Sequence, residues 1–218
     1  MQIMSNFETV PMAIDNSLMW RRYQSKRSSS LYLPEGLPED RQDQIVESLH
    51  YPFGNKIGSG YQSKVYGSGD LAVKVFRPVP MVFRHGNVEG LKIAVSVAKA
   101  LEDGWPIDDD WTLRSVSYWG GIISRYKARW AMDLVDGVTL ADALHQPTAI
   151  HLPNEIGYSM HSHFCQALKA NDISPSTYSQ DFYLENYMVP SAALTQEPVV
   201  ERNIYRVDVG LSRLGYAR

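Results

Sequence analysis

The feature that most constrains this chain is a lysine inside an apolar strand that follows two glycine-rich turns. Residues 57–65 are Ile-Gly-Ser-Gly-Tyr-Gln-Ser-Lys-Val, and Lys74 lies within the apolar run Leu71–Phe76. Between them, Gly67–Asp70 has the composition of a tight turn, which predicts a β-hairpin. A lysine in the middle of such a strand is costly to bury unless it is paired or holds a ligand. The pattern therefore predicts a sheet that carries a polar site.

The glycines of this segment predict a loop that holds phosphate groups. Backbone N–H groups reach phosphate oxygens only where no Cβ is in the way, and the two glycines meet that need. A lone Gly-x-Gly more often makes an ordinary turn, but Lys74 on the next strand favours a phosphate site. Ser63 stands in place of a third glycine, and Val65 is expected to pack over a base. The predicted contacts are Gly58, Ser59, Gly60, Ser63, Val65, Ala72 and Lys74.

Apolar periodicity predicts the elements that follow residue 87. Leu91, Val95, Ala98 and Leu101 recur at helical spacing and are candidates for a buried face, and Thr139 is a candidate N-cap. Gly120–Gly121 interrupts a strand pattern and predicts a turn. The predicted elements are a helix over 88–101, strands over 113–119, from 122 onward and over 129–135, and helices over 139–144 and 154–171.

Glu89 is the best candidate for an acidic partner of Lys74, because it lies near the start of the helix that follows the lysine strand. The alternative is a solvated carboxylate at a helix N-terminus, where the helix dipole favours negative charge. Glu102, at the other end of this helix, is expected to lie too far away.

A second group of polar residues occurs near the end of the chain. Asp181 and Asn186 are five residues apart, and Asp208 begins Asp-Val-Gly after a further strand pattern. Aspartate oxygens are good ligands for a hard divalent cation. Asp–Asn pairs and Asp-x-Gly turns are common individually, but their order after a predicted helix favours a catalytic loop and a metal-binding turn.

Taken in order, these motifs resemble those of protein kinases over residues 53–214. The size of the chain resembles the minimal kinase-like effectors of bacterial type III secretion systems, among them the HopBF-type effectors. The resemblance implies an α+β fold with a five-stranded antiparallel N-lobe and a truncated, mainly helical C-lobe without an activation segment. The implied parts are a leader over 1–50 and a kinase domain over 51–218, with N-lobe 51–135, hinge 132–137 and reduced C-lobe 138–218.

The resemblance also implies roles for individual residues in a Ser/Thr protein kinase that uses ATP and Mg²⁺. Lys74 would contact the α- and β-phosphates, and Asp181 would orient the substrate hydroxyl and accept its proton. Asn186 and Asp208 would hold the metal ion. Met132 matches the gatekeeper position of the hinge, and the main chain at Asp133 and Val135 would bond the adenine edge.

The sequence departs from the kinase pattern at several positions. Ser179-Gln180 replaces the His-Arg before the catalytic Asp, and Val209 replaces the Phe of the metal motif. The chain ends eight residues after Gly210, and we expect activity without activation-loop phosphorylation or with a partner's help. Tyr183 stands where kinases have a lysine near the γ-phosphate, so another cation would have to supply that positive charge. The candidates are Arg202, Arg206 and Lys169. A pseudokinase module, or a nucleotidyl- or small-molecule transferase on a kinase fold, is therefore an alternative.

Residues 1–50 differ in composition from the rest of the chain. They are polar and carry Arg21-Arg22 and the run Ser28–Ser30, while Ile45, Val46 and Leu49 predict a short helix over 40–50. One interpretation is a flexible leader with a docking helix. The other is a segment that directs secretion and binds a secretion chaperone.

Composition and charge limit the kinds of molecule that the chain is expected to bind. The net charge of −3 argues against a nucleic-acid-binding surface, and no apolar run approaches the roughly 18 residues of a membrane span. Cys165 is the single cysteine, which excludes an internal disulfide. The expected setting is a bacterial protein delivered into the host cytoplasm, with a host protein as substrate. The HopBF-type resemblance implies a eukaryotic heat-shock chaperone as that substrate.

Overall fold

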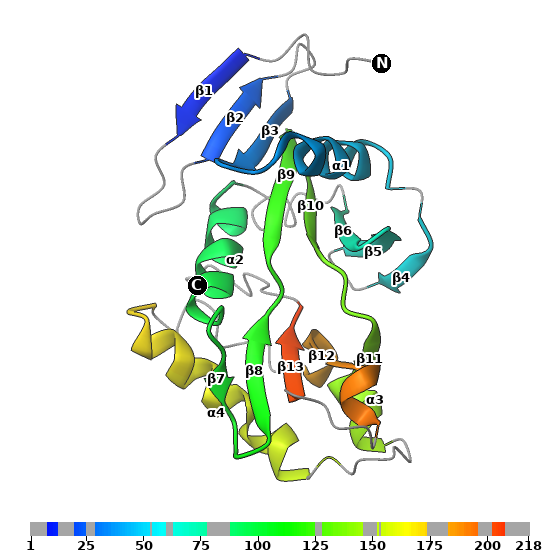
Figure 1. The fold of residues 1–218 in the computed structure, drawn as a ribbon, viewed down its shortest axis with the longest axis vertical. Helices are drawn as coiled ribbons and strands as arrows, with labels where there is room; N and C mark the ends of the chain where they lie inside the picture. Colours follow the sequence, from blue (N-terminus) through cyan, green and yellow to red (C-terminus); the bar gives the residue numbers. More distant parts are fainter. Residues whose placement is uncertain are drawn as a thin grey trace, which may run out of the picture. The chain divides into compact units, whose positions relative to one another are not determined.

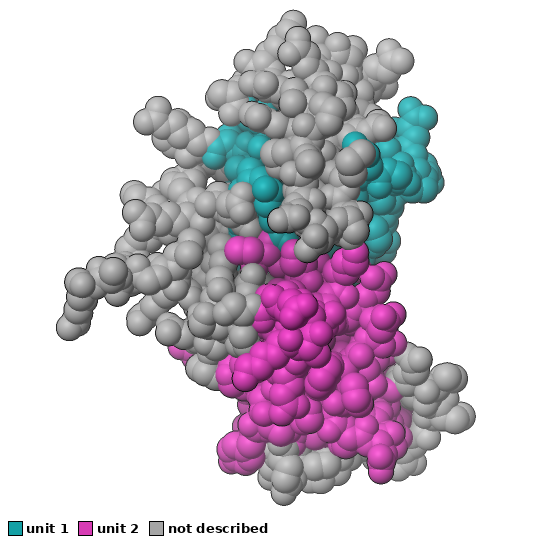
Figure 2. All heavy atoms as spheres, turned by 90° about the vertical axis from the view of Figure 1, so that its left-hand side faces the viewer, with its two compact units in different colours: residues 1–92, 118–134 teal, residues 93–117, 135–218 magenta. Residues whose placement is uncertain are grey.

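The computed structural model describes residues 8–12, 20–24, 29–52, 54–59, 63–77, 88–124, 128–145, 152, 154–173, 183–195 and 202–207. They fall into two compact units, which Figure 2 colours separately: unit 1 is 1–92 with 118–134, and unit 2 is 93–117 with 135–218. The mixture of mainly antiparallel sheets and helices confirms the α+β prediction. None of the described helices combines the length and the apolar character that a membrane crossing requires.

Unit 1 is built on one antiparallel sheet (Figure 1). Along the sheet the strands are β1 (Glu8–Met12), β2 (Trp20–Gln24), β3 (Ser29–Pro34), β9 (Tyr118–Ser124), β10 (Ala128–Asp133), β6 (Leu71–Phe76), β5 (Ser63–Ser68) and β4 (Lys56–Ser59). The prediction of five strands is wrong, because β1, β2 and β3 extend the sheet beyond β9 to make eight. The other five strands are those of the segment in which we predicted the N-lobe.

The β5–β6 hairpin forms as predicted but with a tighter turn. Ser68 pairs with Leu71, so only Gly69 and Asp70 lie in the turn. Gly69 has φ of +62°, and glycine at the first central position is what a type II′ hairpin turn requires.

Gly120 and Gly121 do not make the predicted turn, since both lie inside strand β9. Gly120 has φ of +144°, and a Cβ on it would lie 2.5 Å from the carbonyl oxygen of Tyr32 in β3. A Cβ on Gly121 would lie 2.8 Å from the carbonyl oxygen of Arg129 in β10. The glycines thus allow close approach of the neighbouring strands rather than a reversal of the chain.

Helix α1 (Glu39–His50) confirms the helix predicted over 40–50 and covers one face of the sheet. Its buried residues Ile45, Val46 and Leu49 belong to the same core as Leu31 and Leu33 of β3 and Leu71, Val73 and Ala131 of β6 and β10. Arg129 of β10 donates to the carbonyls of Leu49 and His50, at 2.6 and 2.9 Å, and so satisfies the last turn of the helix. The core therefore continues across residue 50, where we predicted a domain boundary.

Helix α2 (Val88–Ala100) confirms the helix predicted over 88–101. Leu91, Val95 and Leu101 are buried as expected, together with Ala94 and Val97, whereas Ala98 is only half-buried.

Unit 2 contains a second sheet, which we did not predict, although most described residues of the segment 138–218 that lie in regular elements are helical. Its strands, in order, are β11 (Gly137–Thr139), β12 (Tyr187–Pro190), β13 (Arg202–Arg206), β8 (Trp111–Ser115) and β7 (Trp105–Pro106). The prediction of one strand over 113–119 is also wrong, because the strand pattern divides at Val116 and Ser117. β8 pairs in parallel with β13, and the Val116 N–H donates to the Arg206 carbonyl at 3.2 Å.

The helices of unit 2 are α3 (Leu140–His145), α4 (Asn154–Ala170) and the short 3-10 helices η3 (Leu184–Asn186) and η4 (Ser191–Leu194). The Thr139 hydroxyl oxygen accepts a bond from the Asp142 N–H at 3.0 Å, which confirms Thr139 as the cap of α3. Gly157 allows α3 and η3 to approach α4, since a Cβ there would lie 2.9 Å from a methyl carbon of Leu144 and 3.6 Å from one of Leu184.

Candidate functional site

The predicted nucleotide contacts of unit 1 gather on one face of its sheet. Gly58 pairs with Val65, Val65 with Lys74, and Ala72 with Met132. Residues directly opposite in an antiparallel pair share a face, and so do residues two apart in one strand. Gly58, Ser63, Val65, Ala72, Lys74 and Met132 therefore point to the same side.

This face is the one opposite to helix α1. The alternate residues of the same strands, Leu71, Val73 and Ala131, pack in the core against α1. Burial also changes along the Lys74 face. Ala72, Lys74 and Met132 are buried, whereas Val65 and Gly58 toward the sheet edge are half-buried. The helix thus supports the sheet from behind the predicted site.

Aromatic side chains surround Lys74, whose side chain is buried with an exposed fraction of 3%. Its Nζ lies 5.2 Å from the ring centre of Phe76, within the range of a cation–π contact. Trp130 lies opposite Lys74 in the β10–β6 pairing, and its ring packs edge-on against Phe76 with centroids 4.6 Å apart. Tyr118 packs against the other side of this cluster, 6.1 Å from Trp130.

Helix α2 approaches the same face of the sheet as Lys74. A Cβ on Gly121 would lie 3.3 Å from a methyl carbon of Leu91, and Gly121 pairs with Trp130, which pairs with Lys74. Glu89 lies in α2, two residues before Leu91. Its side chain is outside the described residues, so the predicted ion pair with Lys74 stays a prediction.

The predicted hinge begins where β10 ends. Met132 is buried opposite Ala72. The carboxylate of Asp133 accepts a hydrogen bond from the Trp119 indole N–H at 2.5 Å. The N–H of Leu134 donates to the carbonyl of Asp70 in the hairpin turn at 3.1 Å. Val135, the other expected adenine contact, is half-buried and belongs to unit 2.

In unit 2 the structure brings Asn186 next to the residue that precedes Asp208. Asn186 ends helix η3 and begins the β12–β13 pairing, in which Tyr187 lies opposite Arg206. The N–H of Val207 donates to the carbonyl of Asn186 at 3.0 Å. The described end of the strand pair thus places the Asn186 main chain beside that of Val207.

Two of the three cations considered as replacements for the missing lysine, Arg202 and Arg206, make other contacts in unit 2, and the third, Lys169, is exposed near the end of α4. The Arg206 side chain is 2% exposed, and its guanidinium lies 4.9 Å from the ring of Phe164 and 4.6 Å from that of Tyr187. Arg202 lies 3.7 Å from the carboxylate of Asp110. Tyr183 itself is 67% exposed, just before η3.

Several predicted residues are not part of the shared face. Ser59 pairs with Lys64, on the other side of the sheet. Gly60, Asp181 and Asp208 lie outside the described residues. Among the described part of the chain, no group of three or more acidic, His or Cys side chains forms a metal site.

Sequence reasoning missed Phe76 and Trp130, which lie around Lys74. Phe76 follows Lys74 by two residues, so period-two alternation would have placed it on the same face. Trp130 has no comparable signal, because its position depends on the register between β10 and β6.

No protein-family model matches the sequence, and a comparison with curated proteins finds no similar sequence. Solved structures similar to the chain include the kinase domain of PknI from Mycobacterium tuberculosis, with 17% identity and a TM-score of 0.45 over 73% of this chain. A cysteine-to-alanine mutant of that kinase domain matches with 16% identity and a TM-score of 0.43. The chain spans 59% of the length of each of these two kinase domains.

Proposed function

We propose that this chain has a protein-kinase-like fold and transfers the γ-phosphoryl group of ATP to a serine or threonine of a protein. The observation that carries the proposal is the shared face of the unit 1 sheet. Gly58, Val65 and Lys74 lie directly opposite one another on three adjacent strands. A glycine, an apolar residue and a buried lysine in that order offer backbone for phosphates, a surface for a base and a fixed positive charge.

Each residue of the proposed site has a distinct task. Gly58 lets the backbone approach the phosphates, and Lys74 holds them by charge. The buried Met132 and Ala72 bound the space for the adenine, whose edge meets the main chain at Asp133 and Val135. Asp181 orients the substrate hydroxyl and takes its proton as the oxygen attacks phosphorus.

Asn186 and Asp208 are the proposed holders of Mg²⁺. An amide oxygen and a carboxylate fit a hard cation, and the Asn186–Val207 hydrogen bond supports bringing the two motifs together. Mg²⁺, when bound, neutralises charge on the phosphates. The β12–β13 pairing, in which Tyr187 lies opposite Arg206, supports the nearness of the two motifs in this proposal.

We also propose the biological setting that the sequence resemblance implies. The chain is a bacterial effector, secreted into the host cytoplasm with the help of a secretion chaperone, and its substrate is a host protein such as a eukaryotic heat-shock chaperone. Because Ser179-Gln180 replaces the His-Arg that grips a phosphorylated activation loop, the enzyme needs no activation-loop phosphorylation.

A second candidate function is a pseudokinase that binds nucleotide or a partner without transfer. The exposed Tyr183 favours it, because a lysine near the γ-phosphate is replaced while Arg202 and Arg206 make other contacts. Nucleotide binding without transfer to any protein would support this candidate.

The test is incubation of purified protein with labelled ATP and Mg²⁺, using host lysate and, separately, purified heat-shock chaperone. The wild type should label a host protein, whereas Asp208→Ala and Lys74→Ala should not. Asp109→Ala, at an exposed aspartate of unit 2, is the matched control and should label normally. Undiminished labelling by both site variants would overturn the assignment. Mass spectrometry of the product separates an added phosphate from an added nucleotide.

A further inference from the structure

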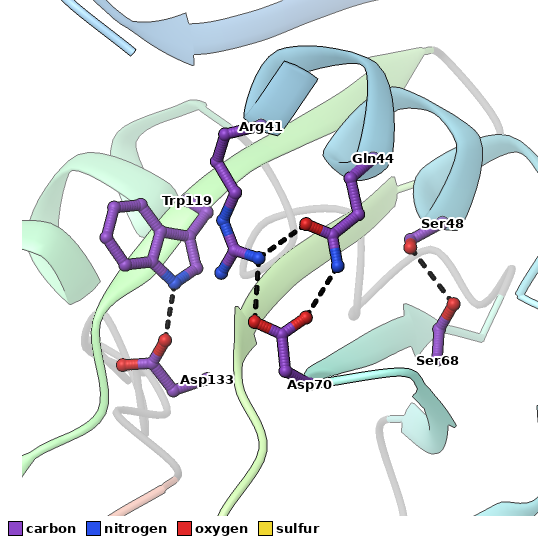
Figure 3. A network of polar contacts seen from close by, with 7 residues as sticks. All are labelled: Arg41, Gln44, Ser48, Ser68, Asp70, Trp119 and Asp133. Carbon is purple, nitrogen blue, oxygen red and sulfur yellow. Dashed lines mark hydrogen bonds and ion pairs between the residues drawn. The ribbon is translucent and has the colours of Figure 1, made fainter. Parts of the chain in front are cut away.

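Helix α1 is joined to the start of the hinge by a closed ring of contacts, and Figure 3 shows the side chains that take part in it. The Arg41 guanidinium donates to the Asp70 carboxylate at 2.7 Å and lies 5.3 Å from the ring centre of Trp119. Trp119 donates to Asp133, and Leu134, the next residue, donates to the Asp70 carbonyl at 3.1 Å. We call this set the Arg41 ring; its members are Arg41, Asp70, Trp119, Asp133 and Leu134.

Gln44 strengthens the ring from one turn further along α1. Its amide donates to the second oxygen of the Asp70 carboxylate at 2.6 Å, and its own oxygen accepts from Arg41 at 2.6 Å. Both carboxylate oxygens of Asp70 are therefore bound by α1. The hydrogen bond from Arg41 is also the largest cause that lowers the pKa of Asp70.

The ring acts on the main chain that is expected to meet the adenine edge. Asp133 is one of the two expected adenine contacts, and Leu134 lies between it and the other, Val135. The end of β10 also pairs with β6 through Asp133 and Leu71, and the ring adds contacts from α1 and β9 to this strand pairing. Trp119 of β9 binds the side chain of Asp133, while α1 binds the side chain of Asp70, whose carbonyl accepts the Leu134 amide.

We infer that Arg41 is a positioning residue of the nucleotide site, acting through Asp70 and Trp119 on the hinge. The inference rests on the proposed function, because it assigns Arg41 a role in the same site. It gives residues 39–50 a task in nucleotide binding besides that of covering the core.

The test compares Arg41→Ala, Asp70→Ala and the double variant with wild type. Each single variant should raise the Kd for ATP about threefold to tenfold, and the double variant should be no worse than the weaker-binding single variant. The KM for ATP should rise while kcat stays unchanged. Added salt should shrink the difference from wild type, because Asp70 is exposed and its ion pair is screened.

Ser48→Ala is the matched control, because Ser48 joins the same helix to the same hairpin through Ser68 at 3.0 Å but lies outside the ring. It should leave the Kd for ATP unchanged. Arg41→Lys keeps the charge but loses the planar fork and the stacking on Trp119, so it should restore only part of the affinity.

Amide hydrogen exchange of Leu134 gives a readout that needs no nucleotide. Exchange should be faster in Arg41→Ala and Asp70→Ala than in wild type and Ser48→Ala. Unchanged Kd and unchanged Leu134 exchange in both ring variants would overturn the inference while the proposed function stands. If the wild type binds no ATP, the proposed function and the nucleotide role fall together, and faster Leu134 exchange would support the mechanical link alone.

Discussion

Trp130 lies directly opposite Lys74 in the pairing of β10 with β6, and both side chains are buried. With Phe76 they place the lysine among aromatic rings. A methionine of similar length fills the same space without the charge, so it tests what the amine does for the reaction.

Lys74→Met should lower phosphoryl transfer about 100-fold, the scale seen when one stabilising group is removed from a charged transition state, while the protein stays folded at the assay temperature. Thermal melting and labelled-ATP transfer give the two measurements. Lys64→Met, at an exposed lysine of β5, is the control and should change neither. Full activity of Lys74→Met would contradict the role given to this lysine.

Gly58→Ala tests whether the backbone at this position must come close to the phosphates, because the substitution should affect nucleotide binding without affecting folding. A Cβ there would meet only Val65, at 3.7 Å, which is an ordinary contact. The melting temperature should thus stay within a few degrees of wild type, while the Kd for ATP should rise about tenfold because the methyl group obstructs the phosphates. Gly137→Ala is the contrasting variant. Its Cβ would lie 2.1 Å from the Val189 carbonyl oxygen, so it should lower the melting temperature. Equal nucleotide affinity in wild type and Gly58→Ala would contradict the proposed phosphate loop.

Tyr183→Lys restores the positive charge that the kinase pattern has at this position. Tyr183 is exposed, so the substitution should not disturb the fold. If the missing charge limits the reaction, transfer should rise about tenfold, which corresponds to a barrier lowered by about 1.4 kcal/mol. The measurement is the initial rate on the substrate identified from lysate, with Tyr158→Lys on the exposed surface of α4 as control. A rate no higher than wild type would show that this charge does not limit transfer.

Acid should destabilise unit 1 through His50. Burial, and then the charge of Arg129, lowers the pKa of His50 below its ordinary value of 6.5. The folded state thus favours the neutral imidazole, and this contribution to stability is present above pH 6.5 and is lost as the pH falls through the lowered pKa. Denaturant unfolding at a series of pH values should show a falling free energy in that window.

His50→Gln should flatten this pH dependence, because a neutral amide gains no proton. Burial also lowers the pKa of His161 in unit 2. The pH dependence of unfolding in His161→Gln is therefore measured as well, to separate the part that comes from unit 1 from the part that comes from unit 2. An unchanged slope in His50→Gln would assign the effect to other groups.

Part of this structure could be predicted from local sequence patterns. The helix over Glu39–His50 and the hairpin around Gly69 follow from periodicity and turn chemistry, which act within a few residues. The shared face of Gly58, Val65 and Lys74 follows from the same hairpin logic.

The remaining features depend on contacts between distant segments. Gly120 predicts a turn or a close approach equally well from sequence, and only the Tyr32 carbonyl of β3 decides between them. The pairing of β8 with β13 and the reach of Arg41 to Asp70 are likewise invisible to local patterns, because each joins residues far apart in the chain. Strand β3 was missed because its partner β9 lies near the middle of the sequence, and β1 and β2 join the sheet only through β3.

That distant pairing of β3 with β9 has a consequence for folding during synthesis on the ribosome. Residues 29–50 leave the ribosome well before residues 118–133, which supply their strand partner and much of the surface that α1 covers. Until then Leu31, Leu33, Ile45 and Leu49 have no completed core to enter, and sheets closed by such non-local pairs form slowly. The newly made segment over 29–50 should therefore stay open to cellular factors that bind unfolded chains until β9 and β10 have been made.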